Sequence, residues 1–250
     1  MDDRTDADLD FERDGVVVIR GALPPALAVA CADDLWRAVE EESGQVRGAP
    51  ATWTEPMVRI AGLATPAFAE AGHTPALVAA YDRLVGPGRW QRLYGLGTIP
   101  VRFPHRDPQP DAGWHIEGGW VDESGVMRCS LASPTRALLL LHLFSEVGED
   151  DAPTLVRLGS HHDVAPFLRD AGEAGRPWAD VCADVVPAST GRTEMAVTGR
   201  AGDVWLAHPL LVHSANPWHR GREPRLMSQQ ALPWVPGAVD VSRGRPPRPR

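Results

Sequence analysis

The chain contains no lysine, so all 25 of its basic side chains are arginines. This absence excludes Schiff-base chemistry, P-loop nucleotide binding and a lysine general base. A carboxylate substrate would have to be bound by arginine, whose planar guanidinium can hold both carboxylate oxygens. The bias towards arginine is also typical of GC-rich bacterial genomes, and we expect a bacterial protein.

Cysteine is scarce and scattered. The three cysteines are Cys31, Cys129 and Cys182, their number is odd, and no C-x-x-C motif occurs. A disulfide framework and a thiolate zinc site are therefore disfavoured. We expect buried free thiols.

Long apolar runs are also missing. The run from Ala137 to Leu141 is the size of a strand, whereas a membrane span needs about 20 residues. The first six residues are acidic and polar and lack the basic start of a secretory signal. The net charge of −8 argues against nucleic-acid binding. We expect a cytoplasmic protein with neither a nucleic-acid nor a membrane partner.

The length of 250 residues, 43% of them hydrophobic, is sufficient for one large domain. We predict a single domain over residues 1–241. Residues 242–250 contain four arginines and three prolines, and this composition predicts a disordered tail. The sequence leaves the oligomeric state open.

The N-terminal third predicts one strand and two helices. Residues 15–20 are rich in β-branched side chains, and prolines open predicted helices over 25–42 and 74–85. Residues 44–72 have no clear periodicity.

The remainder predicts short strands separated by glycine and proline, with a helix at the start of 163–184. Such regular short strands are typical of a β-sandwich or barrel, here with a helical layer against it. The candidate strands are 96–103, 114–120, 136–145, 153–158, 194–198, 203–207, 210–213 and 225–232.

His115 and Glu117 form the most informative motif. Residues i and i+2 of a strand point to the same face, so this pair offers an imidazole and a carboxylate to one point. His213 from a distant strand would complete a set of two histidines and one carboxylate. That set leaves coordination positions open and suits non-haem Fe(II) better than structural zinc. Taken alone, the His-x-Glu pair is also compatible with a surface salt bridge.

Two nearby histidines are alternatives. His105 and Asp107 have the same spacing, but flanking prolines favour a loop over a strand interior. His208 lies five residues before His213, so the two would face opposite ways on one regular strand. We favour His213 as a ligand, with His208 in the core or behind the ligands.

Arg225 begins an apolar strand and has Ser228 close by. A guanidinium inside a β-sandwich needs an anion, because an unpaired buried charge is very costly. A dicarboxylate cosubstrate would supply that anion. Arg102 alternates with Val101 and Phe103 and is a further candidate for meeting a carboxylate.

Five segments in order resemble the bacterial phytanoyl-CoA dioxygenase-like family of Fe(II)/2-oxoglutarate oxygenases. Together they span roughly residues 10–235 of this chain. The segments are 11–21, 100–104, 114–117, 152–161 and 202–213, followed by Arg225.

The resemblance implies a mainly β fold with flanking helices, the double-stranded β-helix or jelly roll of cupin-like proteins. It also implies Fe(II) held by His115, Glu117 and His213, and 2-oxoglutarate with its far carboxylate on Arg225. In such enzymes O₂ oxidises 2-oxoglutarate to succinate and CO₂, and a substrate C–H bond is then oxidised, usually to an alcohol. Further candidates for lining the cosubstrate pocket are Trp120, Thr154, Ser228 and Arg102.

One position departs from the family, which usually has aspartate where this chain has Glu117. Glutamate keeps the charge and reaches one methylene further, so we expect iron binding to survive. The retained carboxylate argues against halogenation.

We therefore predict an Fe(II)/2-oxoglutarate-dependent dioxygenase that hydroxylates a small organic molecule in bacterial biosynthesis or catabolism. One alternative is a 2-oxoglutarate-independent cupin enzyme, such as a metal-dependent isomerase or epimerase, which would need no partner for Arg225. The other is a non-catalytic barrel that binds a small ligand. The sequence does not identify the substrate or the position oxidised, nor does it separate hydroxylation from desaturation or epimerisation.

Overall fold

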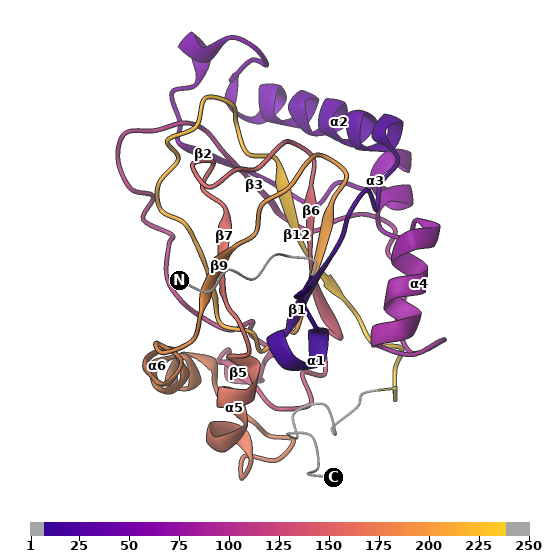
Figure 1. The fold of residues 1–250 in the computed structure, drawn as a ribbon, viewed down its shortest axis with the longest axis vertical. Coiled ribbons are helices and arrows are strands. Elements are labelled where there is room, and N and C mark those ends of the chain that lie inside the picture. The colour runs from indigo at the N-terminus through magenta and orange to yellow at the C-terminus, as the bar shows by residue number, and fades with distance from the viewer. Residues whose placement is uncertain (1–7, 239–250) are drawn as a thin grey trace.

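The computed structural model describes residues 8–238, in which helices flank a stack of antiparallel sheets (Figure 1). The predicted tail at 242–250 and the acidic start lie outside the described residues. The mainly β expectation with flanking helices is confirmed. Among residues 8–238 the strands form four separate antiparallel sheets.

The largest sheet has the strand order β1-β10-β6-β12. A backbone pair between Arg102 and Arg225 places β3 beside the start of β12, and β3 in turn pairs with β2. The strands are β1 (Val16–Ile19), β2 (Met57–Ile60), β3 (Ile99–Arg102), β6 (Leu138–Leu143), β10 (Val204–Ala207) and β12 (Met227–Leu232).

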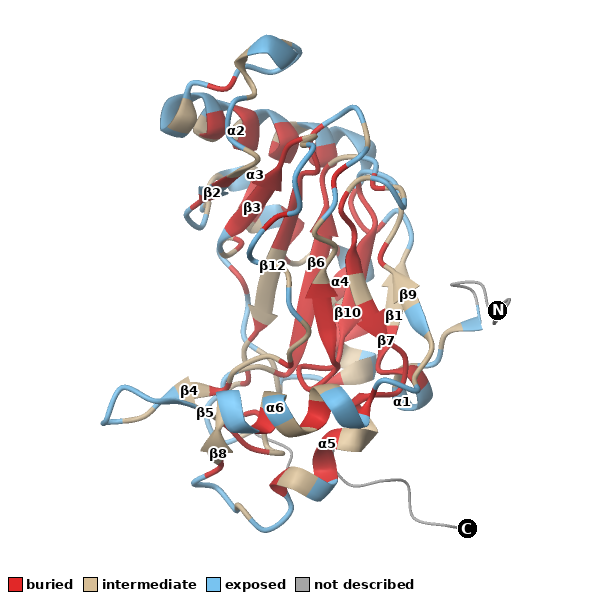
Figure 2. Cartoon of the chain, turned by 90° about the vertical axis from the view of Figure 1, so that its left-hand side faces the viewer, coloured by how far each residue is buried: buried red, intermediate tan, exposed pale blue. Residues whose placement is uncertain are grey.

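The second sheet has the order β11-β7-β9, and a backbone pair between His115 and His213 adds the segment around His115 beside β11. A third sheet, β4-β5-β8, lies at the end of the molecule where α5 and α6 pack, and its β4–β5 hairpin projects outwards (Figure 2). The strands are β4 (Trp120–Val121), β5 (Met127–Cys129), β7 (Thr154–Arg157), β8 (Arg176–Pro177), β9 (Glu194–Ala196) and β11 (His213–Ala215).

Helices cover both ends of the sheet stack. The long helix α2 begins with Pro25 at its first turn and ends at Gly44, whose φ of +71° suits glycine. The Thr74 hydroxyl caps α4 by accepting a hydrogen bond from the Leu77 N–H. The helices are α1 (Phe11–Asp14), α2 (Pro25–Ser43), α3 (Pro66–Ala71), α4 (Pro75–Leu84), α5 (His161–Leu168) and α6 (Trp178–Ala188), with a 3₁₀ turn at Pro50–Thr52.

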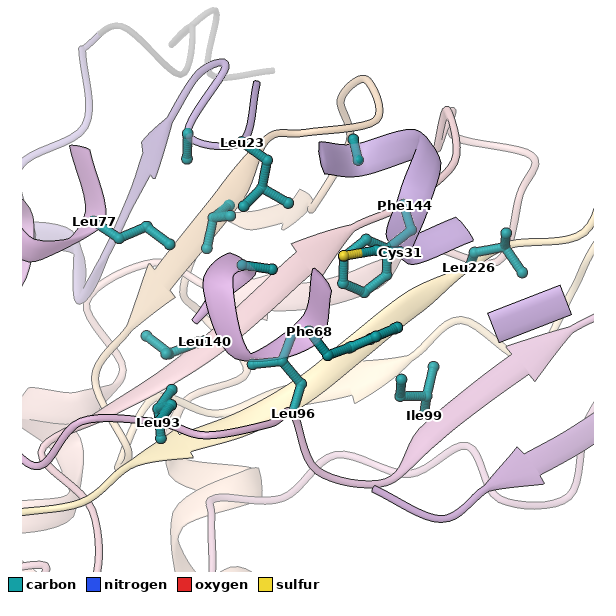
Figure 3. Close-up of a cluster of buried hydrophobic side chains, with 14 of the residues drawn as sticks. Leu23, Cys31, Phe68, Leu77, Leu93, Leu96, Ile99, Leu140, Phe144 and Leu226 are labelled. Atoms are coloured by element: carbon teal, nitrogen blue, oxygen red, sulfur yellow. The ribbon is translucent and has the colours of Figure 1, made fainter. Parts of the chain in front are cut away.

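The strand alternation divides the core into layers. Along β6, Leu138, Leu140 and Phe144 face α2, α3 and α4, in a cluster that also contains Phe68 and Cys31 (Figure 3). The other face of β6 presents Leu139, Leu141 and Leu143 to the space between the two main sheets, where they meet residues of β7, β10 and β12. A third cluster lies under α5 and α6. Side chains on the Leu139 face of β6 are therefore those that reach the interior.

Most predicted elements are present, and the differences lie where the chain changes direction. The predicted strand at 114–120 is broken: only a single pair at His115 and the short β4 at its end are formed. The predicted strand at 210–213 is displaced to β11. The segment 44–72 contains β2 and α3, and α6 continues the predicted helical segment.

Two expectations about composition can be compared with the structure. All three cysteines are free; Cys31 and Cys129 are buried, whereas Cys182 is partly exposed. Burial raises the pKa of the Cys31 thiol to about 12, so this thiol is unreactive. No helix formed by residues 8–238 has the length and apolar character needed to cross a membrane.

Candidate metal centre

Three side chains converge in the space between the two main sheets. One ligand atom from each of His115, Glu117 and His213 can be chosen so that all lie within 4.8 Å of one another. The backbones of His115 and His213 exchange two hydrogen bonds of 2.9 Å, which places these residues directly opposite each other. The grouping predicted from the sequence is therefore present, assembled from two neighbouring segments.

The local alternation of the chain aims these side chains inwards. Ile116 is fully buried in the cluster under α5 and α6, and Trp114 packs against the same cluster. The indole N–H of Trp178 donates to the Ile116 carbonyl at 2.6 Å and fixes the segment from that side. Because Ile116 faces the helices, His115 and Glu117 face the interior.

In both His115 and His213, Nδ1 is the ring nitrogen that forms a hydrogen bond. Nδ1 of His115 lies 2.7 Å from the Gly113 carbonyl, and Nδ1 of His213 lies 2.9 Å from the Leu211 carbonyl. Since a carbonyl can only accept, each Nδ1 carries the proton and each Nε2 presents a lone pair. The Nε2 of His213 is buried with no hydrogen-bond partner among residues 8–238, and it lies 3.5 Å from Oε1 of Glu117.

The electrostatics favour neutral imidazoles. Burial, followed by the nearby His213, lowers the pKa of His115 to about 4, and burial also lowers the pKa of His213. Neutral imidazole is the form that binds metals, so no proton has to leave before coordination. Two imidazole nitrogens and one carboxylate oxygen are a donor set that fits divalent iron with positions left open.

Arg136 is part of this cluster and was not predicted as a site residue. Its guanidinium donates to Oε2 of Glu117, and the side chains of both residues are 20% exposed. Arg136 lies two residues before the apolar strand β6. That position, an arginine heading an apolar strand, is the signal that identified Arg225, and it applies equally to Arg136.

A second basic cluster lies at the start of β12. Arg225 and Arg102 are 1% and 2% exposed and form a backbone pair between the residues just before β12 and the end of β3. Arg102 donates to both oxygens of Asp111, at 2.9 and 2.8 Å, whereas the Arg225 guanidinium donates, among residues 8–238, only to the Ala152 carbonyl. Within the described chain no carboxylate forms a salt bridge with Arg225, and its Nε is buried without a partner.

The two arginines of the basic cluster are buried and repel each other, and both effects destabilise the folded protein. Burial and the charge of Arg102 lower the pKa of Arg225 to about 9, which marks a cation short of compensating charge. His219, also buried and not predicted as a site residue, lies close enough for the charges of both arginines to lower its pKa further, to about 4, after the effect of burial. An anion bound here would relieve this repulsion.

The other residues predicted to line the cosubstrate pocket, Thr154, Ser228 and Trp120, do not lie together. Thr154 is buried on the inward face of β7, and its hydroxyl lies 3.9 Å from the sulfur of Met227. Ser228 is on the opposite face of β12 from Arg225 and lies 3.4 Å from Nδ1 of His142. Trp120 lies on β4, paired with Arg128. The structure thus brings Thr154 towards Arg225 but places Ser228 and Trp120 elsewhere.

The alternative histidines lie outside the cluster. The backbone N–H of Asp107 donates to Nδ1 of His105, a local loop contact, and Asp107 itself is exposed. His208 packs against the rings of Phe11 and His161 at 6.2 and 4.9 Å. Neither belongs to the group formed by His115, Glu117 and His213.

Three of the solved structures with a similar fold are those of SnoN, HygX and SnoK. The epimerase SnoN, in complex with Fe³⁺, α-ketoglutarate and nogalamycin RO, has a TM-score of 0.60 at 22% identity over 89% of this chain and 80% of its own. HygX from Streptomyces hygroscopicus, with nickel, 2-oxoglutarate and hygromycin B bound, has a TM-score of 0.55 at 19% identity over 88% of this chain and 82% of its own.

The third is SnoK, a non-heme α-ketoglutarate-dependent carbocyclase from nogalamycin biosynthesis, with a TM-score of 0.51 at 21% identity over 90% of this chain and 84% of its own. No protein-family model matches the chain, and no curated protein sequence matches it. At these identities the similarity establishes a shared fold. SnoN and HygX are crystallised with iron or nickel and with 2-oxoglutarate, and this chain carries a His-Glu-His group.

Proposed function

We propose that the protein is an Fe(II)- and 2-oxoglutarate-dependent dioxygenase that oxidises a small organic molecule. O₂ would be the oxidant, succinate and CO₂ the coproducts, and hydroxylation of a C–H bond the outcome. The observation that carries this proposal is the pairing of two features in one interior: a converging His-Glu-His group, and a buried arginine without a carboxylate partner in the described chain.

The metal group accounts for the choice of iron. His115, Glu117 and His213 would hold the ion and leave further positions open for other ligands. When bound, Fe(II) would supply a redox centre at which O₂ and a 2-oxo acid can react. The chain contributes neutral imidazoles fixed by carbonyls, and Trp178, whose ring packs edge-on against His115 at 6.1 Å, limits access from one side.

The basic cluster accounts for the choice of cosubstrate. The far carboxylate of 2-oxoglutarate would accept hydrogen bonds from Arg225, with Arg102 adding a second positive charge. Arg225 lies just before β12 and points to the same interior as the metal group, because Met227, two residues later, belongs to the interior cluster. Thr154 would line the same pocket. Bidentate arginine binding favours a carboxylate over a neutral group.

The fold supports the same assignment. We infer a double-stranded β-helix, which is supported by the strand order β3-β12-β6-β10-β1 on one side and His115 segment-β11-β7-β9 on the other. Together with the sequence resemblance described above, this order supports membership of the phytanoyl-CoA dioxygenase-like family. The neighbouring enzymes, with their bound metals and 2-oxoglutarate, support the same chemistry.

Epimerisation is a second candidate outcome. The neighbour SnoN is described as an epimerase and is bound to α-ketoglutarate, so the same fold and cosubstrate can serve inversion of a carbon centre. A 2-oxoglutarate-independent cupin enzyme and a non-catalytic binding protein are weaker candidates, because neither requires an anion at Arg225.

Turnover of 2-oxoglutarate tests the proposal. We expect the Fe(II)-loaded protein to release succinate slowly in air, even without its substrate, and His213→Ala to abolish both metal binding and this release. His105→Ala, in the loop, is the control and should keep both. Metal binding without succinate release would favour the 2-oxoglutarate-independent enzyme, and loss of binding in the His105 variant alone would contradict the ligand assignment.

A further inference from the structure

We propose that Arg136 is a positioning residue that restricts Glu117 to a single oxygen for the metal, keeping a coordination position open at the expense of metal affinity. This inference rests on the proposed function, since it concerns the same site. It assigns a role to an arginine that the triad and the cosubstrate anchor leave unexplained.

The two oxygens of Glu117 have different neighbours. Oε1 lies 3.5 Å from Nε2 of His213, on the side where the imidazole lone pairs converge. Oε2 accepts a hydrogen bond from the guanidinium of Arg136. A carboxylate held in this way has one oxygen free for an ion, whereas a carboxylate without such a partner can turn and offer both.

Arg136 is held in place by its backbone. Its N–H donates to the Ser133 carbonyl at 3.2 Å, its own carbonyl accepts from the Ser133 hydroxyl at 3.0 Å, and the next residue, Ala137, donates to Leu232 of β12 at 2.7 Å. Ser133 is buried with a φ of +42°, a conformation that non-glycine residues seldom adopt. Its carbonyl also accepts from the indole N–H of Trp234 at 3.1 Å. The turn before β6 is thus fixed from several sides, and it aims Arg136 at Glu117.

The length of Glu117 suits this arrangement. The carboxylate spans from His213 on β11 to Arg136 at the head of β6, two strands that belong to different sheets. Aspartate, one methylene shorter, would reach less far from the same backbone position. The glutamate of this chain and Arg136 are therefore a matched pair.

Restricting the carboxylate matters because the coordination positions are all needed. His115, Glu117 and His213 would supply three donor atoms to the ion, and its remaining positions would be needed by the cosubstrate and by O₂. A second oxygen from Glu117 would occupy a position required by the cosubstrate or by O₂. Arg136 also places a positive charge near the ion, which weakens metal binding and favours the arrival of the dianionic cosubstrate.

The sign of the change in metal affinity distinguishes this role from a structural one. If Arg136 only supported the fold of the site, its removal would disorder Glu117 and weaken metal binding. If Arg136 competes with the metal for Glu117, its removal should tighten metal binding and weaken that of 2-oxoglutarate.

The test uses Co(II), a spectroscopic probe for the iron, with the wild type, Arg136→Met, Arg136→Lys and the control Arg128→Met. Arg128 pairs with Asp122, and its side chain is 25% exposed, close to the value for Arg136. We expect Arg136→Met to bind Co(II) about tenfold more tightly, in contrast to the roughly 10- to 100-fold loss of affinity that follows removal of a partner that supports a metal ligand. Its visible Co(II) absorption should change, and the Kd for 2-oxoglutarate on the Co(II) protein should rise by about tenfold. Arg136→Lys should fall between the two, and Arg128→Met should match the wild type in all three measurements.

Weaker or unchanged Co(II) binding by both Arg136 variants, or an unchanged spectrum, would overturn the inference while leaving the proposed function in place. Equal effects of Arg128→Met would also overturn it. A wild type that binds no divalent metal would contradict the proposed function and this inference together. Thermal unfolding in the presence of a chelator shows that each variant is folded, and Arg136→Lys, which retains the charge, allows the test even if Arg136→Met is unstable.

Discussion

Arg225 carries a positive charge in the buried interior, where an unpaired charge destabilises the folded protein. It is 1% exposed, and Arg102, directly opposite, adds repulsion. If Arg225 binds the far carboxylate of 2-oxoglutarate, Arg225→Met should raise the KM for 2-oxoglutarate. Loss of a buried charge-assisted pair costs about 2–4 kcal/mol, which corresponds to a rise of roughly thirty- to a thousandfold.

The control for that prediction is Arg222→Met. Arg222 is exposed, three residues before Arg225, and its replacement should leave the KM unchanged. Initial rates of succinate release at varied 2-oxoglutarate give both values. An unchanged KM in the Arg225 variant would move the anchor to Arg102, and a raised KM in the Arg222 variant would point to a general effect of charge.

The sequence identified residues of the candidate site where a short-range rule applied. His115 and Glu117 follow from strand alternation, and Arg225 from a charge at the head of an apolar strand. Arg136 satisfies the same rule as Arg225, but its partner Glu117 is 19 residues away and only the packing of β6 against the His115 segment brings the two together. His219 lies between β11 and β12 in a segment without periodicity, so no local pattern marks it.

At the scale of elements, the sequence predicted the helices and strands with a clean period and missed those without one. The strand expected at 114–120 is interrupted because Gly118 and Gly119 let the chain turn from β11 towards the β4–β5 hairpin. A Cβ on Gly119 would lie 2.8 Å from the Arg128 carbonyl, so this close approach needs glycine. The pattern of apolar residues does not predict such a turn, because both glycines are also compatible with an alternating strand.

The hairpin that follows Glu117 is fixed from the other side by Gly175, which gives an element-scale prediction. Gly175 has a φ of +60°, and a Cβ there would lie 2.2 Å from the Cys129 carbonyl of β5. We expect Gly175→Ala to destabilise the protein by about 2–5 kcal/mol, from the left-handed backbone and the clash together. Gly172→Ala is the matched control, because Gly172 has a φ of +58° and open space around it, and should cost only about 1–2 kcal/mol. Urea denaturation measures the free energy of unfolding of both variants. Equal losses of stability would contradict the prediction, because they would show that β5 moves to accommodate the added methyl group without loss of stability.

At the scale of the whole molecule, the layers bury four imidazoles of the described chain outside the candidate site, and three of them, His142, His161 and His219, have lowered pKa values. His142 is fully buried between β6 and α3, with its ring parallel to that of Phe144, so it faces the helical layer and not the metal group. His161 lies under the N-terminal segment, and His219 lies beside the two buried arginines. Burial, the largest cause in each case, lowers the pKa of His142 to about 3 and those of His161 and His219 to about 4.

These shifts predict how stability depends on pH. Each imidazole is neutral in the folded protein but takes up a proton on unfolding once the pH is below its ordinary pKa of 6.5. Between pH 6.5 and about 4 the unfolded chain therefore binds more protons, and the free energy of unfolding should fall as the pH is lowered through this window. Each group should contribute about 1.4 kcal/mol per pH unit at full effect, and nothing above the window. The aspartates with lowered pKa values, such as Asp203, act below their ordinary value of 3.8 and so outside it.

His142→Gln isolates one of these contributions. In urea denaturation with a chelator present, this variant should show a pH slope smaller than that of the wild type by about one proton between pH 4.5 and 6. Leu141→Ala, which removes buried packing from β6 without removing a titratable group, should keep the wild-type slope. The comparison depends on slopes and not on absolute stabilities, because the loss of packing in the His142 variant lowers its stability at every pH. If the two variants had the same slope, the His142 ring would have to gain its proton within the folded protein, and the tight layer between β6 and α3 would have to open to admit it.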